Sequence, residues 1–146
     1  QYLYGLARAG RSEADVLLEA VRRAAATAPD AVREAWADVA LPASEGLLAH
    51  ARGDYAAARR RLGPALARML EVGGSHAQRD LFEQIYVDAV LRGGDCSLAQ
   101  QMLERRRACE PDGVPLNRRL AVLYDELGLP AQATRAAERA RRPQSG

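Results

Sequence analysis

Four ionisable side chains near the middle of the chain each lie three residues from one of the others and four residues from another, namely His76, Arg79, Asp80 and Glu83. This spacing places them on one face of a helix. Such a face could bind an anionic group, with His76 and Arg79 as donors close to a helix N-terminus. A structural interpretation competes with this one, because Ser75 can cap the helix while Asp80 pairs with His76 or Arg79. We favour the structural interpretation, since ion-pair networks of this kind are common where no function is involved.

No pattern in the chain predicts catalysis. The two histidines, His50 and His76, have no cysteine nearby that would complete a zinc site, and no glycine-rich loop has phosphate-binding spacing. Ser75 precedes His76 directly, but adjacent residues of a helix point apart and cannot act as nucleophile and base. We therefore predict no enzyme, no catalytic residue, no metal and no cofactor.

The charged residues limit the classes of partner. All 21 basic residues are arginine and 19 acidic residues nearly cancel them, so no strong positive field for nucleic acid is expected. The triplets 59–61 and 105–107 lie within helical patterns, where consecutive side chains diverge. Cys96 and Cys109 lie near opposite ends of one predicted helix and cannot form a disulfide with each other. Two unpaired cysteines and the absence of a long apolar run predict a protein of the bacterial cytoplasm without a membrane segment.

Helix formers and glycine turns organise the chain into helix pairs. Alanine, leucine and arginine are abundant, whereas strand-favouring aromatic residues are few. We predict an all-α fold of four antiparallel pairs, at about residues 2–27, 31–71, 75–109 and 115–141. These pairs form one domain over residues 1–142, followed by a disordered tail at 143–146.

Two details of the early helices are also predicted. The helix before residue 27 should bury the apolar stripe formed by Val16, Leu17, Ala20, Val21 and Ala24. Pro42 either interrupts a helix or lies in the first turn of a new one.

Three of the pairs share a register. When the turn glycines Gly53, Gly94 and Gly128 are aligned, a small residue recurs early in each second helix, as Ala58, Ala99 and Ala133. Four residues later come Leu62, Leu103 and Ala137. A small side chain allows two helices to cross closely, and a larger one a turn later fills the space between pairs. The offset from Ala99 to Ala133 matches the length of a tetratricopeptide repeat. The sequence thus predicts a short right-handed solenoid of this type.

A longer stretch resembles a particular family. The run Gly73-Gly74-Ser75-His76-Ala77-Gln78-Arg79-Asp80-Leu81 follows Glu45-Gly46-Leu47-Leu48-Ala49 and Arg52-Gly53-Asp54-Tyr55. Together these segments resemble the C-terminal part of the tetratricopeptide repeat protein thirty-eight family, over about residues 30–111. The resemblance implies a helical-repeat fold and no established activity.

The repeat resemblance also implies a binding surface. First helices of such repeats line a concave groove, and the positions that would face it are His50, Gln84, Asp88, Arg118 and Asp125. The alternative for these positions is an ordinary solvated helix face without a binding role. We expect a protein-interaction or scaffolding module that binds a protein or peptide partner in this groove. The alternative is that the chain, which starts at Gln1 inside a helical pattern, is a structural part of a larger enzyme or assembly. In that case His76, Arg79 and Asp80 would complete a site elsewhere. A further expectation is a homodimer formed through an uncapped terminal repeat.

Overall fold

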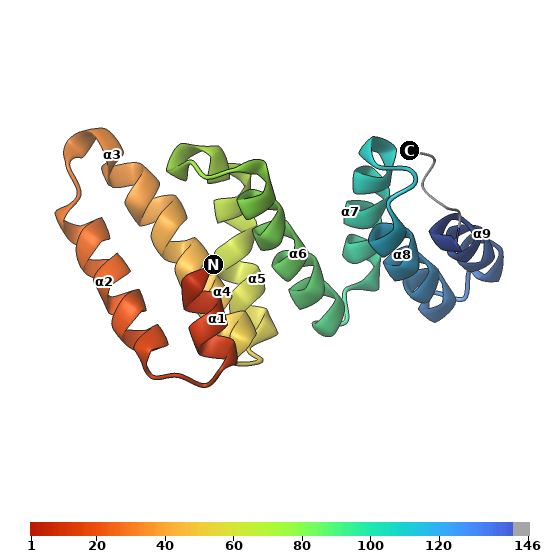
Figure 1. Cartoon of the computed structure of the whole chain (residues 1–146), viewed down its shortest axis with the longest axis horizontal. Coiled ribbons are helices and arrows are strands. Elements are labelled where there is room, and N and C mark those ends of the chain that lie inside the picture. Colours follow the sequence, from red (N-terminus) through yellow and green to blue (C-terminus); the bar gives the residue numbers. More distant parts are fainter. Residues whose placement is uncertain (142–146) are drawn as a thin grey trace. The chain divides into compact units, whose positions relative to one another are not determined.

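The computed structural model describes residues 1–141, and every regular element among them is a helix (Figure 1). The all-α prediction is confirmed for this part of the chain. The predicted tail at 143–146 lies outside the described residues. Cα packing divides the chain into two compact units, with the boundary between Gly93 and Gly94. This boundary falls inside the pair predicted at 75–109, and the single repeat domain stays a prediction.

The first unit contains six α-helices, a π-helical turn and a 3₁₀ turn. The helices are α1 (Tyr2–Arg8), α2 (Glu13–Thr27), α3 (Asp30–Glu34), α4 (Leu41–Ala51), α5 (Tyr55–Ala67) and α6 (His76–Arg92). The π-helix η1 (Ala35–Ala40) joins α3 to α4, and the 3₁₀ helix η2 (Met69–Val72) follows α5. Glycine turns and side-chain caps set the boundaries. At the α4–α5 turn Gly53 has φ +83°, and the Asp54 carboxylate accepts a hydrogen bond from the Ala57 amide at 2.8 Å.

Pro42 lies in the first turn of α4, which is the second of the two predicted alternatives. The chain nevertheless stays helical from α3 through η1 into α4, and the Leu41 amide donates to the Trp36 carbonyl, five residues back. A proline inside a helix removes one hydrogen bond and its ring crowds the carbonyl four residues earlier. A wider π turn directly before Pro42 accommodates both effects.

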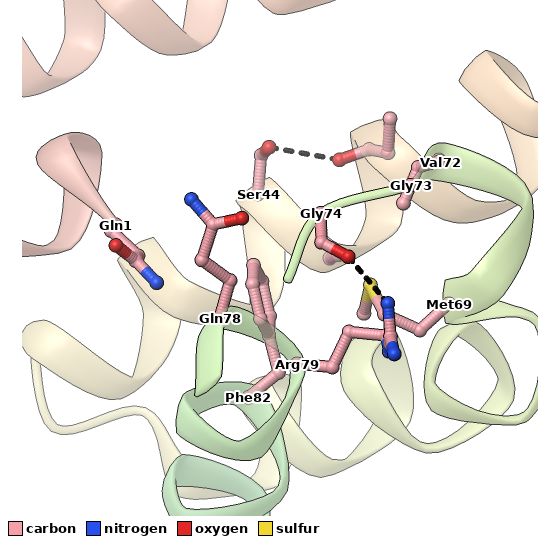
Figure 2. Close-up of a pocket in the computed structure, with 11 residues that line it drawn as sticks. Gln1, Ser44, Met69, Val72, Gly73, Gly74, Gln78, Arg79 and Phe82 are labelled. Carbon is pink, nitrogen blue, oxygen red and sulfur yellow. Dashed lines mark hydrogen bonds between the residues drawn. The ribbon is translucent and has the colours of Figure 1, made fainter. Parts of the chain in front are cut away.

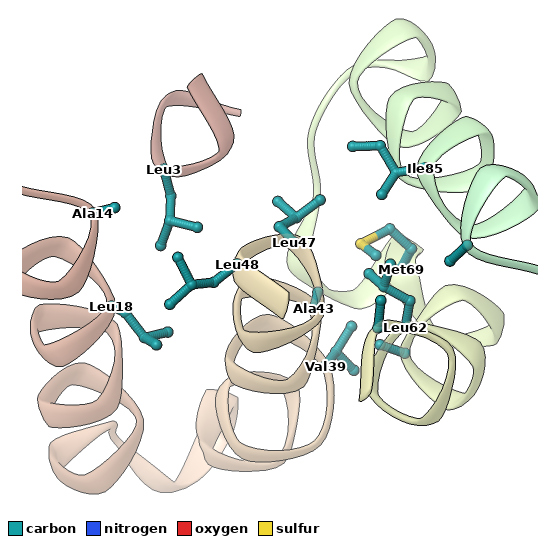
Figure 3. Close-up of a cluster of buried hydrophobic side chains, with 13 residues drawn as sticks. Leu3, Ala14, Leu18, Val39, Ala43, Leu47, Leu48, Leu62, Met69 and Ile85 are labelled. Atoms are coloured by element: carbon teal, nitrogen blue, oxygen red, sulfur yellow. The ribbon is translucent and has the colours of Figure 1, made fainter. Parts of the chain in front are cut away.

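The core of the first unit joins α1, α2, η1, α4, α5, η2 and α6. Figure 3 shows Leu3 and Leu18 directed toward Leu48, and Leu62 and Met69 gathered on the other side of α4. The helices α4 and α5 cross closely at Gly46, where an added Cβ would lie 2.6 Å from Leu62 Cγ. The absence of a side chain at Gly46 therefore allows α4 and α5 to pack tightly.

The prediction of which face of α2 is buried is wrong, because the buried face is rotated by about one residue from the predicted one. None of the five predicted residues is fully buried, and Val16 is 66% exposed. The buried residues are Ala14, Leu18 and Ala25, which have an equally good helical spacing. Contacts with α1 and α4 select this second face.

The second unit contains three helices within the described residues. They are α7 (Cys96–Cys109), α8 (Val114–Glu126) and α9 (Pro130–Arg141). Leu116, Leu120, Leu123 and Tyr124 form the buried face of α8, as their spacing predicts. Cys96 and Cys109 are free thiols, also as predicted. No helix among residues 1–141 is both long and apolar enough to cross a lipid bilayer.

Candidate functional site

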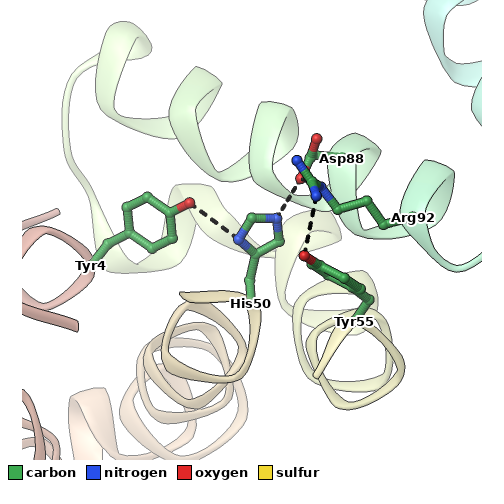
Figure 4. Close-up of polar contacts among 5 residues, drawn as sticks. All are labelled: Tyr4, His50, Tyr55, Asp88 and Arg92. Atoms are coloured by element: carbon green, nitrogen blue, oxygen red, sulfur yellow. Dashed lines mark hydrogen bonds and ion pairs between the residues drawn. The ribbon is translucent and has the colours of Figure 1, made fainter. Parts of the chain in front are cut away.

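His50 lies in the interior of the first unit at the centre of a polar network (Figure 4). Its Nδ1 lies 3.1 Å from the Tyr4 hydroxyl of α1, and its Nε2 lies 2.8 Å from Asp88 Oδ2 of α6. The same Asp88 oxygen accepts a hydrogen bond from Arg92 Nε at 2.8 Å. Arg92 also donates to the Tyr55 hydroxyl and lies over the Tyr55 ring, 5.4 Å from its centroid. The network therefore connects α1, α4, α5 and α6.

The hydrogen-bond pattern indicates which atoms of the network carry protons. Burial raises the pKa of Asp88, but hydrogen bonds from His50 and Arg92 outweigh it and leave that pKa below its usual value. Asp88 is therefore an ionised acceptor at neutral pH, so His50 Nε2 must carry a proton. In the neutral imidazole, Nδ1 then accepts the proton of the Tyr4 hydroxyl.

Tyr4, His50 and Asp88 form a hydroxyl–imidazole–carboxylate chain, which is the order found in nucleophilic triads. Two observations argue that this chain is structural. Burial raises the pKa of the Tyr4 phenol, which disfavours a phenolate nucleophile. Moreover, His50 is only 6% exposed, which corrects the expectation that its side chain faces a groove. The network satisfies a buried histidine and ties four helices together.

The cluster predicted at the start of α6 surrounds a surface pocket of about 300 Å³, which we call the α6 pocket. Its apolar side comes from α5 and η2 and its ionisable side from the first two turns of α6. The lining residues are Leu66, Ala67, Met69, Leu70, His76, Arg79, Asp80 and Glu83. The structure thus brings the four residues of the sequence motif together at one site. Leu70, one of these lining residues, is 75% exposed, which is unusual for a large apolar side chain.

A second pocket of about 260 Å³, the loop pocket, adjoins the α6 pocket and is also lined by Arg79 (Figure 2). It is bounded by the loop through Gly73 and Gly74, by α4 and by Phe82 of α6, and it shares Met69 and Arg79 with the α6 pocket. The Arg79 guanidinium donates to the Gly74 carbonyl. Arg79 thereby holds the loop against α6.

The first turn of α6 is held by reciprocal caps. Ser75 Oγ accepts from the Gln78 amide, and the Gln78 side chain accepts from the Ser75 amide at 2.8 Å. This capping box satisfies two amides that would otherwise lack partners, and it confirms the predicted role of Ser75. It fixes the helix start that carries His76 and Arg79.

The other predicted groove residues lie on two different units. Gln84 is exposed on α6 and its Nε2 donates to Asp80 Oδ2 at 2.6 Å. Asp88 is half-buried in the His50 network. Arg118 and Asp125 are exposed on α8 of the second unit. A shared groove for these residues stays a prediction.

The contacts of several polar residues of the interior were not anticipated from the sequence. Tyr4 and Asp88 are 46 and 38 residues away from His50, so no local spacing links them. The i,i+4 pair of Asp88 and Arg92 could have been found by its spacing alone. In the second unit Asn117 is fully buried, and its Nδ2 donates to the carbonyls of Pro111 and Gly113 at 2.9 and 3.0 Å. It holds the turn that precedes α8.

Known proteins offer no direct guide to the function. No family model matches this chain, and no solved structure is significantly similar to it. Within residues 1–141, no three His, Cys, Asp or Glu side chains are grouped so that they could hold a metal ion. The function must therefore be inferred from the surface features of the two units themselves.

Proposed function

We propose that this chain is a protein-interaction module and that a segment of a partner protein docks at the α6 pocket. The observation that carries the proposal is the α6 pocket itself, a hollow of about 300 Å³ with one apolar and one ionisable side, whose lining includes the exposed Leu70. Interfaces are dominated by a few apolar anchors that enter such hollows, surrounded by a polar rim. His76, Arg79, Asp80 and Glu83 supply that rim.

We further propose that the helix pairs form a cytoplasmic, tetratricopeptide-like solenoid. Ala58 and Ala99 are both fully buried, and Leu62 and Leu103 are 0% and 3% exposed. Their equal burial supports the equivalence of these positions in two second helices. The tight crossing of α4 and α5 at Gly46 is a further supporting feature.

Peptide selection on the full chain tests the docking proposal. Displayed random peptides of about 15 residues should yield ligands whose saturable binding weakens about tenfold with Leu70→Ser, since loss of a central apolar anchor costs about 1–2 kcal/mol. Val122→Ser is the matched control, because Val122 is 61% exposed on α8 and belongs to the second unit. Peptides that bind wild type and Leu70→Ser equally would place the docking site elsewhere and refute the proposal.

A second candidate is a contribution to the site of a larger enzyme or assembly. It is favoured by one observation, that His76, Arg79 and Asp80 line the same pocket. If it is right, His76→Ala and Arg79→Ala in the whole protein lower turnover or assembly at unchanged stability. If these variants keep full function and only melt earlier, the cluster is structural.

A further inference from the structure

The surface around η2 is acidic, although the chain as a whole has a formal net charge of +2. Arg68 follows α5 and pairs with three carboxylates, those of Glu34, Asp38 and Glu71, at 3.8, 3.1 and 2.7 Å. The α6 pocket next to it adds Asp80 and Glu83 against Arg79. Five carboxylates thus face two arginines over this surface, which we call the η2 surface.

The carboxylates of the η2 surface differ in whether a cationic side chain of this chain already pairs with them. A hydrogen bond from Arg68 lowers the pKa of Glu71, so Glu71 stays ionised. Glu83 is exposed and has no hydrogen bond or ion pair within residues 1–141, and the same holds for His76. Glu83 is therefore available to a cation from outside.

The apolar part of the η2 surface has two anchoring points. The α6 pocket and the loop pocket adjoin each other, because Met69 and Arg79 line both. Leu70 and Val72 of η2 are 75% and 39% exposed. A helix presents apolar side chains at offsets of three, four and seven along one face, which suits two adjoining pockets. No strand occurs in residues 1–141, so a partner there finds no sheet edge onto which an extended peptide could add.

We infer that the partner segment bound at the η2 surface is a basic amphipathic helix. Its apolar face enters the two pockets, and its arginines or lysines pair with Glu83, Asp80 and Glu71. This inference rests on the proposed docking function and adds the secondary structure and the charge of the partner. Opposite charge across an interface raises the association rate and excludes partners of the wrong sign.

Two synthetic helical peptides test the inference on the full chain. Both carry leucines at offsets of three, four and seven, and the flanking positions are lysine in one and glutamate in the other. Fluorescence anisotropy should show at least about fivefold tighter binding of the lysine peptide, because two exposed ion pairs contribute about 1 kcal/mol together. The preference should shrink as salt is raised to about 0.5 M.

Charge-reversal variants test whether Glu83 causes the preference for the lysine peptide. Glu83→Arg should remove most of the preference for the lysine peptide, whereas Glu126→Arg, at an exposed position of α8, should leave it unchanged. Equal binding of the two peptides, both weakened by Leu70→Ser, would overturn the charge inference and leave the docking proposal standing. Saturable binding of neither peptide up to about 1 mM, or binding insensitive to both Leu70→Ser and Glu83→Arg, would overturn the inference. Failure of the peptide selection as well would refute the docking function itself.

Discussion

Replacing Gly46 with alanine should destabilise the first unit, although alanine is the better helix former. The added Cβ would lie 2.6 Å from Leu62 Cγ and 3.1 Å from Leu62 Cδ2, whereas ordinary contacts begin near 3.4 Å. Leu62 is fully buried and cannot turn away into solvent. The α4–α5 pair must therefore separate by nearly 1 Å, or the leucine must leave its preferred rotamer.

The expected cost follows from two opposing contributions. Inserting one carbon into a well-packed core costs about 1–3 kcal/mol, whereas changing glycine to alanine inside a helix gains about 0.5–1 kcal/mol. We expect a net loss of about 1–2 kcal/mol. For a unit of this size that corresponds to a Tm lower by about 4 °C or more.

Gly5→Ala provides the matched control. Gly5 lies inside α1 with nothing within 4 Å of its added Cβ, so the same chemical change should be neutral or stabilising by about 0.5 kcal/mol. Urea unfolding followed by circular dichroism measures both variants. The double variant Gly46→Ala, Leu62→Ala should show strong coupling, because Leu62→Ala removes the atoms that clash.

Two outcomes would refute this reasoning. One is a Gly46→Ala variant that is as stable as Gly5→Ala. The other is a cost of Gly46→Ala that persists unchanged when Leu62 is already alanine. Either outcome would mean that the α4–α5 crossing is looser than the 2.6 Å approach implies.

Three further predictions concern the polar contacts of the first unit. His50→Ala should cost about 2–4 kcal/mol in urea unfolding, because it leaves a cavity and removes partners of Tyr4 and Asp88; a cost below about 0.5 kcal/mol would contradict the structural role of the network. Because the pKa of Asp88 is lower in the folded than in the unfolded protein, the ionised Asp88 contributes to the free energy of unfolding. This contribution is fully present above the usual aspartate pKa of 3.8, and it is lost as the pH falls through the pKa of Asp88 in the folded protein. The stability difference between wild type and Asp88→Asn should therefore shrink between pH 5 and pH 2, and a constant difference would argue against it. Asp54→Ala should cost about 1 kcal/mol through loss of the α5 cap, whereas Asp54→Asn should keep most of the stability.

Helix boundaries were predictable because local chemistry sets them. Gly53, Asp54 and Ser75 act within a few residues of their own positions, and each ends or begins a helix where the sequence indicated. The buried face of α2 was not predictable in the same way. Val16, Ala20 and Ala24 repeat with the helical period just as Ala14, Leu18 and Ala25 do, and only the contacts with α1 and α4 decide between them.

The candidate site was predictable to the extent that it is local. His76, Arg79, Asp80 and Glu83 share a helix, and their spacing was enough to bring them to one pocket. The apolar side of that pocket comes from α5 and η2, so its shape depends on the tertiary packing of those elements against α6. The interior position of His50 likewise depends on partners from α1 and α6, which no spacing in the sequence reveals.

The π turn at Ala35–Ala40 has a consequence for the evolutionary history of this chain. A π turn holds one residue more than the α-helical turn that it replaces, so it is the structural form of a single-residue insertion. Each residue of an α-helix adds about 100° of rotation, and deleting one residue from this turn would rotate α3 by that angle relative to α4. Relatives whose helix is regular at this point should therefore match the sequence with a one-residue gap just before Pro42.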